Sequence, residues 1–230
     1  MWYDVRFFAG FFCRFSREIA ATVFVSGCNF KCPYCHNSYL IQMREGIKSE
    51  KEFFDYLKKR ANLIEGVCIT GGEPTLWKGL KDFIKNIKDL NFEVKLDTNG
   101  SRPQVLESLL EEGLLDYIAM DIKAPIEKYD MFLKNEKDIE NIKKSVELIK
   151  DSDINYEFRT TVNDKLLTLE DFAFIADWIS PVKRYVLQRY KYAEGVLDKN
   201  LSGTGNCDID FLLKVKEIVS QKIKEVLIRE

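Results

Sequence analysis

The sequence predicts an α/β fold in which parallel strands alternate with helices and form a partial, TIM-like barrel of six β/α units. Short apolar runs alternate with longer segments whose apolar residues recur every three or four positions. The intervals between successive strands, about 20 to 40 residues, suit the helical crossovers that parallel strands require. Polar and glycine-rich motifs follow these strands, at the ends where α/β folds place their ligand sites. A doubly wound open sheet is the alternative.

The six predicted strands are the short apolar runs. They occupy residues 20–25, 66–70, 92–97, 115–121, 156–162 and 184–190. The first reads as a buried strand. The third has apolar residues at alternate positions, which is the period of a strand with one buried face.

Helical spacing of apolar residues predicts the outer layer. It covers residues 50–60, 80–87, 103–113, 139–149, 168–179 and 208–228. Pro103 in the first turn and Gly113 at a left-handed cap delimit the third helix. Thr168 and Asp171 form a capping-box variant that opens the fifth. The last helix, about residues 208–228, closes the chain.

Length and composition suit one domain. The chain has 230 residues, of which 46% are hydrophobic and 31% charged, enough to bury a sizeable core. No linker rich in Pro, Gly or Ser divides it, so residues 1–230 are expected to form a single domain with its core at about 19–190. A full eight-unit barrel takes about 250 residues, so six units give an incomplete one.

Charge and hydropathy limit the partners. The net charge of −2 does not favour nucleic acid or an anionic membrane. Asp4 and Arg6 interrupt the aromatic N-terminal stretch, so it lacks the apolar centre of a signal peptide, and no long apolar run follows. We therefore expect a cytoplasmic protein, where metal binding or catalysis is a more typical role for cysteine than disulfide formation.

Three of the six cysteines, Cys28, Cys32 and Cys35, lie within eight residues directly after the first strand. Thiolates this close can converge on one metal centre, and sulfur ligands select zinc, copper(I) or iron-sulfur clusters. A closed zinc site needs four protein ligands, and His36, the only histidine, is adjacent to Cys35 instead of spaced from it. A four-iron cluster on three cysteines leaves one iron open. The spacing therefore favours a cluster, with structural zinc or an unrelated group of thiols as alternatives.

Polar residues gather at the carboxyl ends of the strands. Gly71-Gly72-Glu73-Pro74 and Asp97-Thr98-Asn99-Gly100 follow the second and third strands, and Asp121 ends the fourth, with Lys123 just beyond it. Arg159 and Thr161 lie on the fifth strand, and Gln188 and Arg189 lie near the end of the sixth. Each alone has a simpler interpretation as a turn or a surface group. Because parallel strands end at one rim, their occurrence in strand order beside the cysteine loop predicts a common site.

The three-cysteine loop, with Tyr34 directly before its last cysteine, and the Gly71-Gly72-Glu73-Pro74 turn resemble the radical S-adenosylmethionine (SAM) superfamily. Residues 32–37, 96–100 and 120–123 resemble the activases of glycyl radical enzymes, particularly the activating proteins of anaerobic ribonucleotide reductase. The resemblance covers about residues 19–190. Activases of this group usually carry Asp-Gly-Pro-Gly or Asp-Tyr-Pro-Gly before the first strand, where this chain has Ser16-Arg17-Glu18-Ile19, so the protein substrate is less well indicated.

The cluster ligands implied by this resemblance are Cys28, Cys32 and Cys35, which would hold one 4Fe-4S cluster with SAM on its fourth iron. The chain lacks the extra ferredoxin-like cysteines of larger activases, so a single cluster is expected. The residues implied to bind or surround SAM are Tyr34, Gly71, Gly72, Glu73, Asp97, Thr98, Asp121, Lys123, Arg159 and Gln188.

Each of these residues has an implied role. The glycine turn and Glu73 would bind the SAM ammonium group, since glycines allow close backbone approach and oxygen atoms suit ammonium. Tyr34 would lie against the adenine, and Gln188 would reach the ribose or adenine. Asp97, Thr98 and Asp121 match positions that coordinate a monovalent cation in relatives. Lys123 and Arg159 would neutralise carboxylate charge.

The implied activity is reductive cleavage of SAM to methionine and a 5′-deoxyadenosyl radical, which takes a hydrogen from a glycine of a partner enzyme. The implied partners are a glycyl radical enzyme, such as anaerobic ribonucleotide reductase, and an electron donor such as flavodoxin or ferredoxin. Two alternatives remain: a radical SAM enzyme acting on a small molecule or nucleoside, and a non-enzymatic zinc or iron-sulfur protein for binding or electron transfer. Cys68 is a predicted core residue, whereas Cys13, Cys207 and His36 receive no role.

Overall fold

The computed structural model describes residues 5–15, 18–43, 49–135, 138–198, 200–201 and 205–230. Its strands form one sheet in which spatial order follows sequence order. The strands are β1 (Val5–Phe15), β2 (Glu18–Val25), β3 (Gly66–Gly71), β4 (Glu93–Thr98), β5 (Tyr117–Asp121), β6 (Asn155–Val162), β7 (Tyr185–Arg189) and β8 (Val226–Arg229). β1 and β2 are antiparallel, and each later pair is parallel. The predicted α/β class is therefore confirmed.

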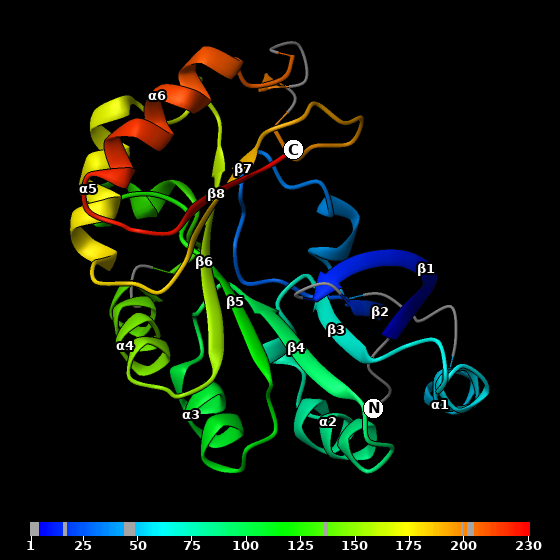
Figure 1. Ribbon diagram of the computed structural model, residues 1–230. Coiled ribbons are helices and arrows are strands. Elements are labelled where there is room, and N and C mark those ends of the chain that lie inside the picture. Colours follow the sequence, from blue (N-terminus) through cyan, green and yellow to red (C-terminus); the bar gives the residue numbers. More distant parts are fainter. Residues whose placement is uncertain (1–4, 16–17, 44–48, 136–137, 199, 202–204) are drawn as a thin grey trace.

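Helices connect the parallel strands and cover the outer side of the sheet (Figure 1). They are α1 (Glu50–Lys59), α2 (Leu80–Lys88), α3 (Pro103–Glu111), α4 (Asp138–Lys150), α5 (Leu169–Ile179) and α6 (Ile209–Ser220). Short 3-10 helices follow β2, β3 and β5: η1 (Ser38–Leu40), η2 (Pro74–Leu76) and η3 (Ile126–Met131). In the described part of the chain the edge strands β1 and β8 do not pair, so the sheet is an open, partial barrel as predicted.

The local signals at two helix ends are confirmed. Thr168 caps α5, accepting a hydrogen bond from the Asp171 N–H, while the Asp171 carboxylate accepts one from the Thr168 N–H. Pro103 is the first residue of α3, and Gly113 takes a φ of 62° just beyond its end. These residues satisfy backbone groups that a helix terminus would otherwise leave without partners.

Two strands lie outside the prediction, and one predicted helix is too long. The helix expected over residues 208–228 ends at Ser220, and Val226–Arg229 is β8. Val226 continues the helical spacing of Val219 and Ile223, but its segment pairs in parallel with β7, with Tyr185 opposite Val226. Pairing across the sheet outweighs local periodicity here. Residues 5–15 form β1, and Ser16 and Arg17, where the activase pattern departs, lie outside the described residues.

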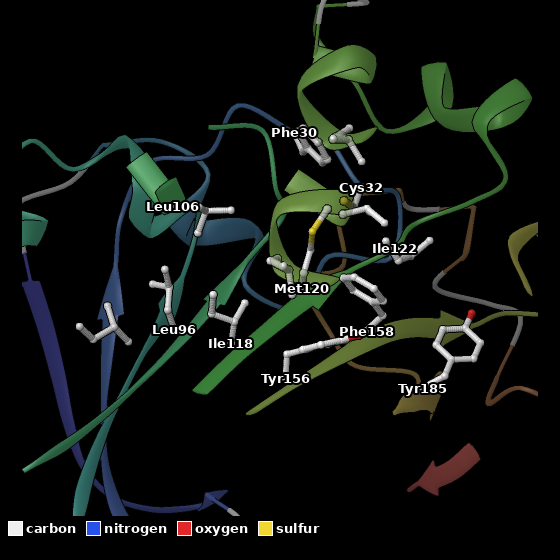
Figure 2. Close-up of a cluster of buried hydrophobic side chains, with 14 of the residues drawn as sticks. Phe30, Cys32, Leu96, Leu106, Ile118, Met120, Ile122, Tyr156, Phe158 and Tyr185 are labelled. Atoms are coloured by element: carbon white, nitrogen blue, oxygen red, sulfur yellow. The ribbon is translucent and has the colours of Figure 1, made fainter. Parts of the chain in front are cut away.

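The hydrophobic core continues from the helix layer to the loop after β2. Leu96 and Ile118, on neighbouring strands, are fully buried and lie together with Leu106 of α3 (Figure 2). Cys32 belongs to the same core cluster and lies near Met120 at the carboxyl end of β5. The cysteine loop therefore packs into the hydrophobic core through Cys32. None of the helices in the described residues has the length and apolar character needed to cross a membrane.

Candidate functional site

A cavity of about 310 Å³ lies at the carboxyl ends of the parallel strands. Its walls come from the loops after β2, β3 and β4 and from the ends of β5, β6 and β7. All thirteen residues singled out in the sequence line it: Cys28, Cys32, Tyr34, Cys35, Gly71, Gly72, Glu73, Asp97, Thr98, Asp121, Lys123, Arg159 and Gln188. The fold thus brings together residues that are up to 160 positions apart in the chain, because parallel strands end at one rim.

The cysteine loop is held on both sides. The Lys31 N–H donates to the Phe132 carbonyl at 2.9 Å, and Phe30 forms a β-bridge with Leu133. Within the loop the Cys35 N–H donates to the Cys32 carbonyl at 3.1 Å. These bonds fix the backbone between the thiols before any metal is bound.

The three thiols fit an iron-sulfur cluster. All are free cysteines; Cys32 is buried, and Cys28 and Cys35 are half-buried. Burial raises the pKa of Cys28 to about 12 and that of Cys32 to about 11, and it also raises the pKa of Cys35. They are thus neutral thiols at pH 7 until a metal displaces their protons.

The same residues fit a single metal ion less well. In the described part of the chain, no three His, Cys, Asp or Glu side chains converge on a position for one ion. His36, the one nitrogen ligand a zinc site could add, is exposed, with its ring 5.8 Å from that of Tyr190. A cluster spreads its iron atoms over several corners and takes thiolates that stand further apart.

The Gly71-Gly72 turn passes directly against the start of the cysteine loop. The Gly72 N–H donates to the Val25 carbonyl at 2.7 Å, and the Glu73 N–H donates to the Gly27 carbonyl at 2.8 Å. A Cβ on Gly72 would stand 2.2 Å from the Gly27 oxygen, and Gly71 has a φ of 121°. Only glycine permits both the approach and this backbone conformation.

Glu73 is a buried carboxylate held by neutral donors. It is 1% exposed and accepts hydrogen bonds from both the N–H and the hydroxyl of Thr75, from the Thr98 hydroxyl at 2.7 Å, and from the Asn99 N–H at 2.7 Å. Burial raises its pKa, although these hydrogen bonds act in the opposite direction. Among the described residues no cation pairs with it, so this wall of the cavity favours a positively charged ligand group.

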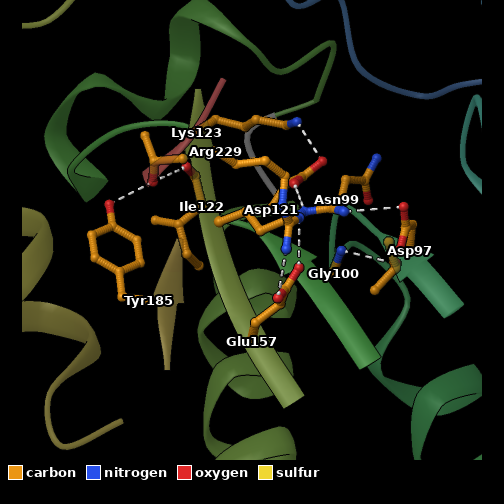
Figure 3. Close-up of polar contacts among 12 residues, drawn as sticks. Asp97, Asn99, Gly100, Asp121, Ile122, Lys123, Glu157, Tyr185 and Arg229 are labelled. Atoms are coloured by element: carbon orange, nitrogen blue, oxygen red, sulfur yellow. Dashed lines mark hydrogen bonds and ion pairs between the residues drawn. The ribbon is translucent and has the colours of Figure 1, made fainter. Parts of the chain in front are cut away.

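An alternating series of ion pairs runs across β4, β5 and β6 at the cavity, and Figure 3 labels three of its members, Asp97, Asp121 and Lys123. Lys95 pairs with Asp97 at 2.8 Å, and Arg159 donates to Asp97 at 3.1 Å and to Asp121 at 2.8 Å. Lys123 completes this series, with its Nζ 2.9 Å from the other carboxylate oxygen of Asp121. Burial by itself would raise the pKa of both carboxyls, but the cations outweigh it and hold both pKa values below their usual range.

These ion pairs do not leave room for the monovalent cation expected at Asp97, Thr98 and Asp121. Each of the four carboxylate oxygens already has a lysine or arginine partner. The Thr98 hydroxyl donates to Glu73 and accepts a hydrogen bond from the Gly100 N–H. A cation would therefore have to displace Arg159, whose charge already serves the same purpose.

The cavity also contains residues to which the sequence analysis gave no role. Asn99, Thr161 and Arg189 belong to the polar motifs predicted at this rim, whereas Phe30, His36, Asn37, Ile41 and Thr70 were not assigned to the site. Phe30, His36 and Asn37 lie in or next to the cysteine loop, and that position is the signal that could have found them. Cys68 is buried in the core as predicted, and Cys207 is also buried. Cys13 lies on β1, outside the residues whose side chains are described.

Comparison with known proteins places the chain in a family. Residues 22–179 match the model of the radical SAM superfamily. The chain belongs to this superfamily. A protein of Methanocaldococcus jannaschii, provisionally named a glycyl-radical enzyme activating enzyme, is 35% identical over 185 residues, 77% of this chain and 75% of its own length. A second M. jannaschii protein with the same provisional name is 27% identical over 89% of this chain and 78% of its own length.

Other relatives in the superfamily have different names. The 7-carboxy-7-deazaguanine synthase of Clostridium acetobutylicum is 26% identical over 64% of this chain and 72% of its own length. Among solved structures, Streptococcus suis SuiB bound to SAM matches with a TM-score of 0.66 at 13% identity, over 88% of this chain and 48% of SuiB. This chain therefore spans about half the length of SuiB. At that identity the match shows the fold of this radical SAM protein and no more.

Proposed function

We propose that this protein is a radical SAM enzyme that generates a glycyl radical on a partner enzyme. The observation that carries the proposal is that the thiols of the cysteine loop and the Gly71-Gly72-Glu73 turn line one cavity. The hydrogen bond from the Glu73 N–H to the Gly27 carbonyl joins the two motifs. The activase part of the proposal is supported by the names of the two M. jannaschii relatives.

Cys28, Cys32 and Cys35 would hold one 4Fe-4S cluster, since three free thiols, one buried and two half-buried, line the cavity. When bound, the cluster and SAM supply one-electron cleavage of a carbon-sulfur bond, which yields methionine and a 5′-deoxyadenosyl radical. The chain's own task is to bind and orient SAM and to exclude water.

The charges of the cavity support binding of the amino acid end of SAM. The Gly71-Gly72 turn and the Glu73 carboxylate would bind the ammonium group, which supplies a cation that Glu73 does not find among the described residues. Lys123 and Arg159 supply positive charge to the cavity lining and would bind the carboxylate group of SAM. We propose that Tyr34, 6% exposed, and Gln188 face the adenosine part.

We propose a glycyl radical enzyme as the partner, with anaerobic ribonucleotide reductase as the first candidate, and a flavodoxin or ferredoxin as electron donor. No base or nucleophile is required for hydrogen abstraction, which agrees with a cavity lining whose one histidine, His36, is exposed. The proposal includes no monovalent cation, because Arg159 already bridges the two carboxylates expected to bind it.

The test is anaerobic. The protein is reconstituted with iron and sulfide, reduced with dithionite and supplied with SAM, and 5′-deoxyadenosine is measured, with Cys32→Ala as the control. We expect deoxyadenosine from the intact chain alone. A cluster-loaded protein that neither binds nor cleaves SAM would overturn the proposal. For the activase part, a partner labelled with deuterium at glycine should transfer deuterium to deoxyadenosine and show a glycyl radical by electron paramagnetic resonance (EPR).

A second candidate is a radical SAM enzyme that acts on a small molecule or nucleoside. The similarity to 7-carboxy-7-deazaguanine synthase favours it. Rapid deoxyadenosine formation combined with no glycyl radical on any tested partner, and deuterium transfer from a small-molecule fraction, would support this candidate over the first. The third alternative is a non-enzymatic zinc or iron-sulfur protein for binding or electron transfer, and one zinc per chain without sulfide would favour it.

A further inference from the structure

Asn29 directly follows the first cysteine of the loop and binds two different parts of the fold. Its side-chain Nδ2 donates a hydrogen bond to the Asp138 carboxylate at 3.1 Å, at the start of α4. Its Oδ1 accepts a hydrogen bond from Asn99 Nδ2 at 3.1 Å, in the turn after β4. One amide group thus bridges two elements that are 109 and 70 residues away in sequence.

Asn99 connects this bridge to the glycine turn. Its backbone N–H donates to Glu73 at 2.7 Å, and its Oδ1 accepts from the Ser101 N–H at 2.9 Å, which fixes the side chain. The path Glu73, Asn99, Asn29, Asp138 is therefore continuous. Glu73, Asn99 and Asp138 are 1%, 6% and 6% exposed and Asn29 is half-buried, so the path is largely shielded from water.

Two residues on this path, Glu73 and Asn29, adjoin groups with separate tasks. Glu73 belongs to the wall proposed to bind the SAM ammonium group, and Asn29 adjoins Cys28, a proposed cluster ligand. The Phe30 N–H lies 3.4 Å from Cys28 Sγ, so the residues on both sides of Asn29 are involved in placing that sulfur. Lys134 Nζ also donates to the Cys28 carbonyl at 3.0 Å.

We propose that Asn29 is a positioning residue that couples the cluster loop to the SAM-binding turn. Its two hydrogen bonds hold Cys28 at a set place relative to Glu73, so that a ligand spanning both is met by a preorganised site. This inference rests on the proposed binding of a cluster and SAM, but not on which substrate loses the hydrogen. Without the bridge, part of the binding free energy of SAM would be used to order the cysteine loop against the glycine turn, so the affinity for SAM would be lower.

The donor and acceptor roles of Asn29 and Asp138 allow a specific test by substitution. Asn29 donates and Asp138 accepts, so Asn29→Asp alone places two carboxylates in contact and removes the donor. Asn29→Asp combined with Asp138→Asn restores one donor and one acceptor in reverse order, and the new carboxylate still accepts from Asn99. Asn141→Ala is the matched control, because Asn141 on α4 donates to the Ser101 carbonyl at 3.2 Å without touching the cysteine loop.

The experiment uses the full chain loaded anaerobically with its cluster. Iron and sulfide per chain are measured first, and the dissociation constant of SAM is then measured for the oxidised, cluster-loaded protein. We expect Asn29→Ala and Asn29→Asp to keep the iron and sulfide content of the unaltered protein and to raise the SAM dissociation constant about tenfold. The reversed pair should return to within about threefold of the unaltered protein, and Asn141→Ala should show no change.

Three results would overturn the inference: an unchanged SAM dissociation constant in Asn29→Ala, a loss of cluster in proportion to the loss of affinity, or a reversed pair no better than Asn29→Asp. The second would make Asn29 a structural residue only. If the unaltered, cluster-loaded protein itself does not bind SAM, the proposed function fails first and this inference fails with it. The two failures are thus distinguished by the unaltered protein.

Discussion

Arg159 donates a hydrogen bond from Nε to Asp121 at 2.8 Å, and the same guanidinium reaches Asp97 at 3.1 Å. Asp97 lies near the carboxyl end of β4, Asp121 is the last residue of β5, and Arg159 lies on β6. The Arg159 side chain therefore joins three adjacent strands at the cavity. All three side chains are largely removed from solvent. The arrangement stabilises the fold only while the two carboxylates keep their cation.

The first prediction concerns this cation. Arg159→Met should lower the free energy of unfolding by about 3–5 kcal/mol, because it leaves two buried carboxylates with one lysine each. Urea unfolding of the metal-free protein measures the effect. Arg184→Met is the control, since the pair of Arg184 with Glu225 is partly exposed and should contribute under about 1 kcal/mol. Equal losses in the two variants would contradict the assigned role of Arg159.

The second prediction concerns monovalent cations. Since Arg159 already bridges Asp97 and Asp121, deoxyadenosine formation should be unchanged when sodium and potassium are replaced by a bulky ammonium salt at the same ionic strength. Initial rates over a series of potassium concentrations provide the measurement. A rate that rises and saturates with potassium would show that a cation displaces the guanidinium.

The third prediction tests the close approach of the glycine turn. Gly72→Ala should lower the free energy of unfolding by about 1–3 kcal/mol, because its Cβ would overlap the Gly27 carbonyl. It should also reduce the iron bound per chain, since the turn and the cysteine loop must separate. Gly113→Ala, where no atom lies within 4 Å, should leave the iron content unchanged while it strains a left-handed backbone. Full iron content in Gly72→Ala would refute the coupling.

The fourth prediction is a pH dependence away from the cavity. The Asp171 carboxylate accepts hydrogen bonds from Lys128 at 2.7 Å and from the Thr168 N–H at 2.8 Å. Burial opposes ionisation, but these bonds prevail and keep the pKa of Asp171 below its ordinary 3.8. A lowered folded pKa contributes stability above the ordinary value, and this stability is lost as the pH falls through the folded pKa.

Asp171→Asn should therefore cost about 1–2 kcal/mol of unfolding free energy at pH 7, and the difference from the unaltered protein should shrink below about pH 4. Urea unfolding across pH 3 to 7 measures it. Asp153→Asn, at an exposed loop position, should change the unfolding free energy at pH 7 by less than about 0.5 kcal/mol. A difference that stays constant down to pH 3 would contradict the assigned ionisation.

The cavity lining was accessible from the sequence because its residues sit in short motifs. The spacing of Cys28, Cys32 and Cys35 and the Gly71-Gly72-Glu73 turn depend on neighbours within a few positions, and strand periodicity indicates where each motif falls. The parallel arrangement then implies a common rim without any knowledge of side-chain contacts. For that reason residues as far apart as Cys28 and Gln188 could be assigned to one site.

Long-range pairing was not accessible in this way. Val226 carries the helical spacing of α6, yet it lies in β8 because β7 offers an unpaired edge. Asp97 and Asp121 have the residue types of cation ligands, yet Arg159 on a different strand already neutralises them. In both cases the conformation or charge state depends on which distant residues packing brings into contact. A local sequence pattern contains no information about those residues.

The sequence by itself determined the α/β class, the strand order of the motifs and the grouping of three cysteines in one loop, since each follows from local periodicity or from residue spacing. Only the tertiary structure decided that Asn29 meets Asp138 across 109 positions and that Glu73 has no cation partner among the residues that the structure describes. Hydrogen bonds and ion pairs act over a few ångströms, so they are set by the distances that packing produces and not by separation along the chain.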